Sequence, residues 1–442
     1  MMCNIGIAKK GWRANVIWFP DPSKAELSFL QDGLLVTALA ADGIVRIEAL
    51  GPFVDLHEVY PDLEITHWPG FCIAPGFVDL HVHYSQTDVI ASPADGLLPW
   101  LERYTFPHEM KFSDVNYARA VARFFLDELN RNGVTTALCF GTSHVESVDA
   151  LMCEAKERNL RIIAGKVLQD RFSPDGLRDV DTPRSLHQTQ DLIEKWHMND
   201  RLGYAITPRF APTSTEHQLR GCGELAEQYP DVWVQSHAAE NKKEIEWVKQ
   251  LYPSARSYID VYDKVGLLRP RAVYAHCVHI DEWDRVRMFE TGTSVACSPT
   301  SNLFLGSGFF DFVEADNSGV QYGLASDVGG GTSFSPFVTM HAAYSVARQD
   351  IEGRAAQSLS PHALWWMHTA GAAKCLGLGG DTGNLLPGCE ADFIVIDPCS
   401  TELLMRRSKQ ANSLEEWLFT LIVLGDDRLI HCVIIQGECR QG

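Results

Sequence analysis

Residues 74–83 read APGFVDLHVH, and the prediction of the fold starts from this stretch. Its apolar side chains are dense enough for a buried strand. On a strand, residues two positions apart point to the same face of the sheet. We therefore expect His81 and His83 to aim at one spot, at about the separation that two ligands of one metal ion need. The pair alone leaves metal binding open, because His-X-His also occurs by chance in long proteins.

This stretch is the first of eight apolar segments that are typical of strands. The predicted strands cover residues 72–83, 134–140, 161–168, 202–209, 232–238, 272–278, 293–298 and 320–327. Helical segments bridge most of them, and the clearest begins after Asp114, a typical N-cap, and stops at Gly133. Eight strands with crossover helices predict an α/β fold, a (β/α)8 TIM-type barrel. A doubly wound sheet is the alternative, which the count of eight disfavours.

Both ends of the chain have a β pattern instead. Short alternating runs near the N-terminus predict a β-hairpin, and residues 392–397 and 431–435 are typical of strands near the C-terminus. Two turn-forming dipeptides bound the N-terminal runs: Asp32-Gly33 and Asp42-Gly43. We expect one small β-sandwich domain formed from both termini. The predicted domains are residues 1–71 and 376–442 for the two parts of the β domain and 72–375 for the barrel.

Composition narrows the class of protein. The chain has 442 residues and a formal net charge of −19, without a basic patch, which argues against nucleic acid or an anionic membrane as a partner. Residues 1–12 lack the apolar region of a signal peptide, and no apolar run reaches the ~18 residues of a membrane span. The twelve cysteines form no C-x-x-C pair. They are typical of reduced thiols, so we expect a cytoplasmic protein.

Further candidate site residues lie at or just beyond the ends of later predicted strands, where barrel enzymes place their catalytic groups. These are Arg209, Phe210, His237, Glu240, His276 and Asp327. Several have an ordinary structural interpretation: Asp327 precedes three glycines and could cap a turn, and Glu240 could begin the next helix. His279, three residues after His276, should face the opposite way and be structural. Three histidines and an aspartate at the ends of strands one, five and eight nevertheless suit Zn²⁺, with Fe²⁺ as the alternative.

The order of these groups resembles that of the metal-dependent amidohydrolase superfamily, as does the segment GNLLPGCEAD at residues 383–392. Within it, five loop motifs resemble the guanine deaminases. They are HYSQTDVIAS (83–92), LLPWLERYTFP (97–107), PRFAPTS (208–214), PTSNLFLGSG (299–308) and LGDDR (424–428). The chain departs from this family at Ala238-Ala239, where a larger residue is expected.

The resemblance implies a zinc-dependent hydrolytic deamination of guanine to xanthine and ammonia. One zinc ion would be held by His81, His83, His237 and Asp327. Asp327 would also take a proton from the attacking water, His276 would orient that water, and Glu240 would protonate the ring. The Ala238-Ala239 departure leaves a related ring, such as 8-oxoguanine, a pterin or a triazine, as the alternative substrate.

The resemblance also implies which residues contact a small purine substrate. They are His83, Tyr84, Ser85, Gln86, Arg209, Phe210, His237, Glu240 and Asp327. Arg209 can donate to O6 and N7, the edge by which arginine recognises guanine in DNA. Gln86 suits the N3 and 2-amino side, and Phe210 offers a stacking face. The family further implies a homodimer.

Two other interpretations are weaker. Binuclear amidohydrolases bridge two metals with a strand lysine, but Lys166 lies on the third predicted strand, whereas the bridging lysine usually comes from the fourth. A non-catalytic scaffold would be expected to have lost metal ligands, and this chain has kept all four.

Overall fold

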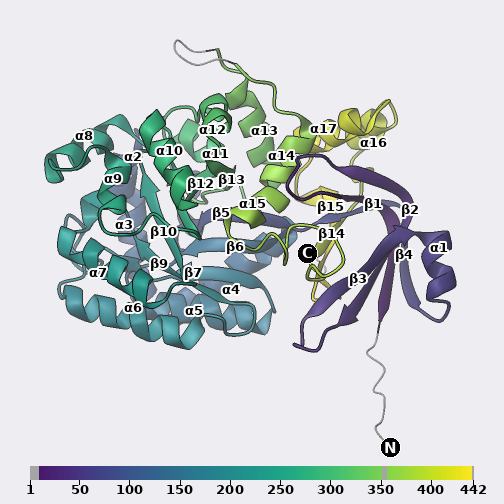
Figure 1. Ribbon diagram of the computed structural model, residues 1–442, viewed down its shortest axis with the longest axis horizontal. Coiled ribbons are helices and arrows are strands. Elements are labelled where there is room, and N and C mark those ends of the chain that lie inside the picture. Colours follow the sequence, from purple (N-terminus) through teal and green to yellow (C-terminus); the bar gives the residue numbers. More distant parts are fainter. Residues whose placement is uncertain (1–8, 351–355, 441–442) are drawn as a thin grey trace, which may run out of the picture.

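The structure is a computed structural model that describes residues 9–350 and 356–440. The first eight residues, part of the region that lacks a signal-peptide pattern, lie outside the described residues. The strands form two sheets, one from the middle of the chain and one from its two ends (Figure 1). The strands of the middle sheet are β5 (Phe77–His83), β6 (Val134–Phe140), β7 (Arg161–Gly165), β8 (Val167–Leu168), β9 (Gly203–Pro208), β10 (Trp233–Ala238), β11 (Ala272–His276), β12 (Ser294–Cys297) and β13 (Gln321–Leu324).

The middle sheet is a nearly closed barrel. Its strands are neighbours in the order of the sequence from β5 to β13, with the short β8 paired beside β9. The pairs from β5 to β13 are parallel. Beyond β13 the chain returns to β5, where the Asp327 N–H donates to the His81 carbonyl and the His83 N–H donates to the Val328 carbonyl, both at 2.9 Å. The barrel is confirmed, and the doubly wound alternative is wrong because the strand order never reverses.

Two predicted strands are divided in the structure. Residues 72–75 end a strand of the other sheet, and β5 starts only at Phe77, after the break at Pro75-Gly76. Proline has no N–H to donate to a ladder, which favours a strand end at that point. The predicted strand 161–168 is interrupted at Lys166, between β7 and β8.

Helices follow the barrel strands and pack on the outside of the sheet. The longest, α4, lies as predicted, because the Asp114 side chain accepts from the N–H groups of Asn116 and Tyr117 and Gly133 follows its end with φ +77°. The helices in this part are α2 (Leu97–Trp100), α3 (Phe106–Glu109), α4 (Val115–Arg131), α5 (Val145–Glu157), α6 (Thr182–Trp196), α7 (Glu216–Gln228), α8 (Lys242–Leu251), α9 (Tyr258–Asp263), α10 (Glu282–Thr291), α11 (Pro299–Phe304), α12 (Phe312–Ser318), α13 (Pro336–Ala347), α14 (Pro361–Met367) and α15 (Ala370–Cys375). Shorter turns are the 3-10 helices η1 (Tyr84–Val89), η3 (Met110–Ser113) and η4 (Ala211–Thr213) and the π-helix η2 (Leu101–Thr105).

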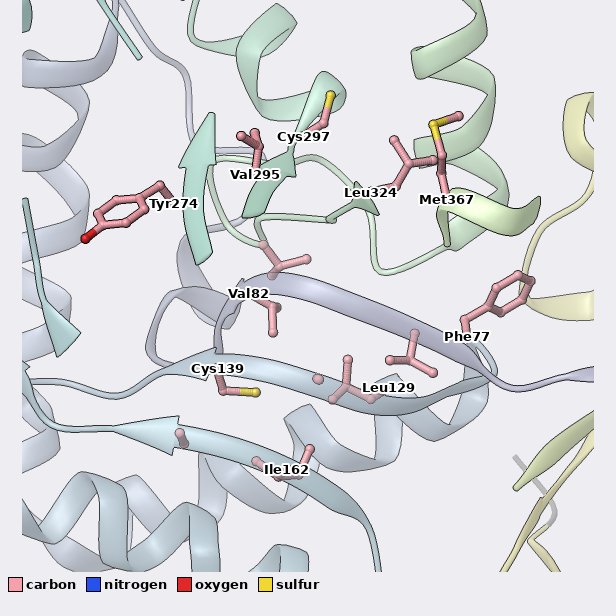
Figure 2. Close-up of a cluster of buried hydrophobic side chains, with 14 of the residues drawn as sticks. Phe77, Val82, Leu129, Cys139, Ile162, Tyr274, Val295, Cys297, Leu324 and Met367 are labelled. Carbon is pink, nitrogen blue, oxygen red and sulfur yellow. The ribbon is translucent and has the colours of Figure 1, made fainter. Parts of the chain in front are cut away.

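Apolar side chains fill both sides of the barrel wall. Inside, Val78, Leu80 and Trp233 belong to one buried cluster with residues of the other strands. Outside, a larger cluster lies between strands and helices, and Figure 2 shows Val82 and Cys139 on neighbouring strands of its wall. The predicted site residues lie instead at the strand ends, beyond this packing.

The two ends of the chain together form a second sheet (Figure 1). Its strands are β1 (Lys10–Trp18), β2 (Ser28–Leu39), β3 (Val45–Pro52), β4 (Glu64–Pro75), β14 (Phe393–Ile396), β15 (Ile430–Ile435) and β16 (Glu438–Arg440), accompanied by α1 (Phe53–Val59), α16 (Glu402–Ser408), α17 (Leu414–Leu424) and η5 (Asp427–Leu429). Strand β14 pairs with β4, so both termini build one domain, as predicted. Its hydrogen bonds join the strands into one seven-stranded sheet in place of the two sheets of a sandwich. The domain boundaries stay a prediction, and β4 crosses the one at residue 71.

One predicted turn is wrong. Strand β2 continues through Asp32-Gly33, and Asp32 adopts φ +52° where the pairing with β1 shifts register. This is a β-bulge, which accommodates a residue with positive φ without ending the strand. The Arg13 guanidinium holds the Asp32 carboxylate at 2.6 Å. The turn between β2 and β3 does contain Gly43, with φ +84°.

Within the described residues, no helix is both long and apolar enough to cross a bilayer.

A buried histidine beneath the barrel predicts how stability depends on pH. The Nδ1 of His368 lies 3.0 Å from the Val78 carbonyl oxygen, and burial lowers the pKa of His368 from 6.5 to about 4. The unfolded chain takes up a proton as the pH falls below about 6.5, whereas the folded chain does so only near pH 4, so acid destabilises the fold. Between pH 7 and pH 5, His368→Gln should lose about 2 kcal/mol less free energy of unfolding than wild type.

Denaturant titrations at the two pH values measure this difference. His187→Gln is the matched control, since the His187 side chain is 72% exposed, and it should follow the wild type. Equal losses in His368→Gln and wild type would contradict the prediction.

Candidate active site

A cavity lies at the C-terminal end of the barrel strands. Polar side chains from the strand ends and apolar side chains from the loops share its lining. The lining residues are His83, Gln86, Leu97, Trp100, Leu101, Arg209, Phe210, His237, Glu240, Glu244, His276, Leu305, Asp327 and Gly330. Residues that are up to 247 positions apart in the sequence thus surround one space. The cavity lies at the barrel end where enzymes of this fold carry out chemistry.

Four donor groups converge beside the cavity. The Nε2 atom of His83 lies 3.2 Å from that of His81 and 3.1 Å from that of His237. The Asp327 Oδ1 atom lies 3.1 Å from His81 Nε2 and 3.6 Å from His83 Nε2. Barrel closure explains this arrangement. The hydrogen bond from the Asp327 N–H to the His81 carbonyl holds the segment after β13 against the end of β5. The four groups predicted as metal ligands are thus neighbours, with His83 in contact with His81, His237 and Asp327.

The protonation of these groups suits a metal ion. Burial lowers the pKa of His81, His83 and His237, which keeps the rings neutral. The Nδ1 of His237 lies 2.5 Å from the Arg209 carbonyl oxygen, so Nδ1–H donates there and Nε2 keeps its lone pair. Burial opposes ionisation of Asp327, but His81, His276 and the Ser301 hydroxyl together outweigh it and lower the pKa of Asp327 to about 2. Three neutral imidazoles and one carboxylate fit a divalent Zn²⁺ or Fe²⁺ ion.

His276 and Glu240 form a second, proton-carrying pair at the same spot. The Nε2 of His276 lies 3.4 Å from Glu240 Oε2 and 3.8 Å from Asp327 Oδ2. Burial opposes protonation of His276, but the charges of Glu240 and Asp327 outweigh it and raise its pKa. Burial also raises the pKa of Glu240. His276 therefore differs from the three neutral rings, although it lies close enough to His81 and His237 to complete a possible ligand group with them.

The loop at residues 299–308 orients this pair. The His276 Nδ1–H donates to the Asn302 side-chain oxygen at 2.9 Å, which turns the other ring nitrogen toward the cavity. The Ser307 hydroxyl donates to Glu240 Oε1 at 2.7 Å. Sequence reasoning assigned no role to Asn302 or Ser307. The motif PTSNLFLGSG could have pointed to them, because a polar, glycine-containing segment directly after a barrel strand often carries functional residues.

Gln86, Arg209 and Phe210 line the other part of the cavity, as expected. Gln86 lies in η1, directly after β5, and Arg209-Phe210 directly follow β9. Apolar side chains face them, and none of these was predicted from sequence. They are Leu97, Trp100, Leu101 and Leu305, which belong to a satellite apolar cluster. A cavity with apolar walls and a few directional polar groups suits a small aromatic ligand.

Two predicted substrate contacts do not line the cavity. The Tyr84 hydroxyl donates to the Ser147 carbonyl at 2.6 Å, and its ring packs on Phe112 with centroids 5.1 Å apart. Ser85 is fully buried but is not among the lining residues. Tyr84 and Ser85 follow β5 closely, and only the side chain of Gln86 from this short 3-10 helix reaches the cavity.

The residues on which the alternative substrate, the binuclear site and the structural role of His279 were argued do not line the cavity. Ala238 and Ala239 are buried but do not line the cavity, so this departure leaves the cavity wall unchanged. The Nε2 atom of His279 lies 2.8 Å from the Ser307 carbonyl oxygen, which is a structural contact. Lys166 Nζ is held by Asp179 at 3.0 Å and by Ser185 at 2.7 Å, outside the cavity. Lys166 is therefore not placed to bridge two metal ions.

Comparison with known proteins agrees with this geometry. Residues 72–440 match the model of the Amidohydrolase family. The chain is 44% identical over 420 residues to a guanine deaminase of Escherichia coli, an alignment that covers 95% of this chain and 93% of the relative. The structure of a guanine deaminase from Bradyrhizobium japonicum superposes with a TM-score of 0.93 at 33% identity, covering 99% and 100% of the two chains. That of C. acetobutylicum, with guanine bound in its active site, superposes with a TM-score of 0.89 at 29% identity, covering 98% and 99%.

Proposed function

Because the chain belongs to the amidohydrolase family, and within it to the guanine deaminases, we propose that it hydrolyses guanine to xanthine and ammonia. Water adds at C2 of the purine, and the 2-amino group leaves. One observation carries this proposal: the buried His and Asp cluster, Glu240 and the guanine-complementary side chains of Arg209 and Gln86 border a single cavity. The guanine that occupies the active site of the similar C. acetobutylicum structure supports it.

We propose that His81, His83, His237 and Asp327 hold one Zn²⁺ ion per chain, with Fe²⁺ as the alternative. Neighbouring donor atoms among the four lie 3.1–3.6 Å apart, and a set of three imidazoles and one carboxylate suits either metal. When bound, such a metal lowers the pKa of water from about 16 toward 7 and supplies hydroxide at neutral pH.

Three side chains move or hold protons in the proposed reaction. Asp327 accepts a proton from the attacking water, and His276 holds that water through Nε2, whose direction is set by Asn302. Glu240 donates a proton to N3 of the ring as charge builds there, takes up the proton of the added hydroxyl and passes it to the leaving amine. The proton held by Asp327 then restores Glu240. Burial raises the pKa of Glu240, the direction that suits a general acid.

Recognition of the ring follows from the remaining polar groups. Arg209 donates to O6 and N7, and Gln86 offers an amide to the N3 and 2-amino side. Phe210, 5% exposed, supplies a face for the ring. His83, His237, Glu240 and Asp327 complete the set of proposed substrate contacts. The homodimer and the cytoplasmic location that family and composition imply stay predictions.

A substrate panel tests the proposed function. Metal-loaded protein should convert guanine to xanthine with release of one ammonia per ring, with a higher kcat/KM than for 8-oxoguanine, a pterin or an aminotriazine. Absorbance of the purine and an ammonia assay follow the two products. A sample with its metal confirmed but without turnover of guanine would overturn the proposal, and a higher kcat/KM for another ring would reassign the substrate.

A further inference from the structure

A buried carboxylate lies directly behind the side chains that contact the ring. Glu109, at the end of α3, is fully buried. Its Oε2 accepts from Arg209 Nη1 at 2.6 Å, and its Oε1 accepts from Arg209 Nη2 at 3.1 Å. The same Oε1 accepts from Gln86 Nε2 at 3.2 Å. One carboxylate therefore contacts both polar groups proposed to recognise the substrate.

The two-point contact restricts how Arg209 can lie. A guanidinium held through both Nη atoms by one carboxylate has a defined plane, and an Arg–carboxylate pair of this kind is directional as well as strong. It leaves the Nε–H and one N–H on each Nη free for another acceptor. The Phe106 ring, from the same helix as Glu109, lies 5.0 Å from the guanidinium carbon. Helix α3 thus holds Arg209 by charge and by an aromatic face.

The contact also decides how the Gln86 amide is oriented. Because Nε2 donates to Glu109, the amide oxygen is turned to the opposite side, where the Gly329 N–H lies 3.4 Å away. Gln86 is 3% exposed, as is Arg209, so neither side chain has bulk water as an alternative partner. Loss of the carboxylate would free both orientations at once and leave a buried guanidinium without a counter-charge.

We propose that Glu109 is a positioning residue that fixes Arg209 and Gln86 in the plane of the purine and thereby selects rings that carry a 6-oxo group. The inference rests on the proposed function and deepens it. Glu109 itself does not line the cavity, so it acts through the two side chains that do. Selection arises because the free N–H groups of a fixed Arg209 are left unpaired by a ring without an acceptor at position 6.

The test compares two rings in Glu109→Gln, an isosteric change that removes the charge. Guanine carries the 6-oxo group, and 2-aminopurine lacks it while keeping the 2-amino group; each is measured as a substrate or, where turnover is slow, as a competitive inhibitor. The preference for guanine should fall by about tenfold to a hundredfold, the range expected for loss of one bidentate arginine contact. Bound metal should stay unchanged. This ratio is independent of the fraction of folded protein, so a merely structural defect does not move it.

Three further variants make the result specific. Glu102→Gln, an exposed carboxylate of the same helical segment, should keep the wild-type preference. Glu109→Asp keeps the charge at a shorter reach and should lie between wild type and Glu109→Gln; it also serves if the glutamine variant fails to fold. In an Arg209→Lys background, Glu109→Gln should cause a smaller further change than in wild type, because the bidentate contact is already lost and only the contact with Gln86 remains to be broken.

The outcomes separate the two proposals. A wild-type protein that binds metal but does not convert guanine overturns the proposed function. A wild type that converts guanine, beside Glu109 variants with an unchanged guanine preference or effects that add fully to those of Arg209→Lys, overturns the role of Glu109 alone.

Discussion

Glu240→Gln is expected to retain the bound metal while kcat for guanine falls by about a hundredfold to ten-thousandfold. The substitution keeps the size of the side chain and can still accept from the Ser307 hydroxyl, which now holds Glu240 Oε1 at 2.7 Å. It removes the carboxyl proton that the ring nitrogen and then the leaving amine need. Because Glu240 lies outside the four converging donor atoms, the affinity for metal should not change.

Metal analysis and steady-state kinetics on the same sample check this result. Glu246→Gln, an exposed carboxylate on α8, is the control and should keep the wild-type kcat. Loss of metal from Glu240→Gln would show that Glu240 is a ligand, and an unchanged kcat would show that it carries no proton in the reaction.

Removal of the metal by a chelator is expected to lower guanine turnover by at least about a hundredfold, because a bound metal is what lowers the pKa of water enough to supply hydroxide at neutral pH. It should also lower the thermal unfolding midpoint, because a ligand that binds only the folded chain stabilises it. The Nε2 atoms of His81 and His237 lie 3.2 Å and 3.1 Å from that of His83, close enough for one cation to hold all three.

Re-addition of one equivalent of metal gives the control. Zn²⁺ should restore both activity and the unfolding midpoint, Fe²⁺ tested without oxygen decides between the two candidate metals, and Mg²⁺ should restore neither, because it prefers oxygen ligands. Full activity after verified removal of all metal would contradict the proposed site.

Local patterns were sufficient for most of the fold. Apolar segments mark every barrel strand, and the cap at Asp114 with the stop at Gly133 marks α4, because both signals lie within a few residues. The turn predicted at Asp32 was wrong because its outcome depends on contacts outside the local sequence. A residue with positive φ ends a strand or forms a bulge, and only the pairing of β2 with β1 and the ion pair with Arg13 select the bulge.

In the candidate site, too, local features could be predicted from the sequence and long-range contacts could not. His81 and His83 are two residues apart on one strand, so their common direction follows from strand geometry alone. The Glu109 contact with Arg209 spans 100 positions, and that of Ser307 with Glu240 spans 67. No local pattern encodes such pairs. Tyr84 and Ser85 were expected at the substrate for the complementary reason: they adjoin His83 in sequence, but their side chains do not line the cavity.

By itself, the sequence predicted the barrel, a β domain built from both termini, a set of candidate metal ligands and the kind of reaction, because strand periodicity, motif order and the chemistry of the side chains are properties of the chain. Only the tertiary structure decided which polar groups hold the reactive ones in place. Barrel closure brings Asp327 to His81, the loop after β12 supplies Asn302 and Ser307, and α3 brings Glu109 behind Arg209. These contacts form only when distant segments are packed together, since a buried charge or ring nitrogen must find its partner wherever the fold provides one.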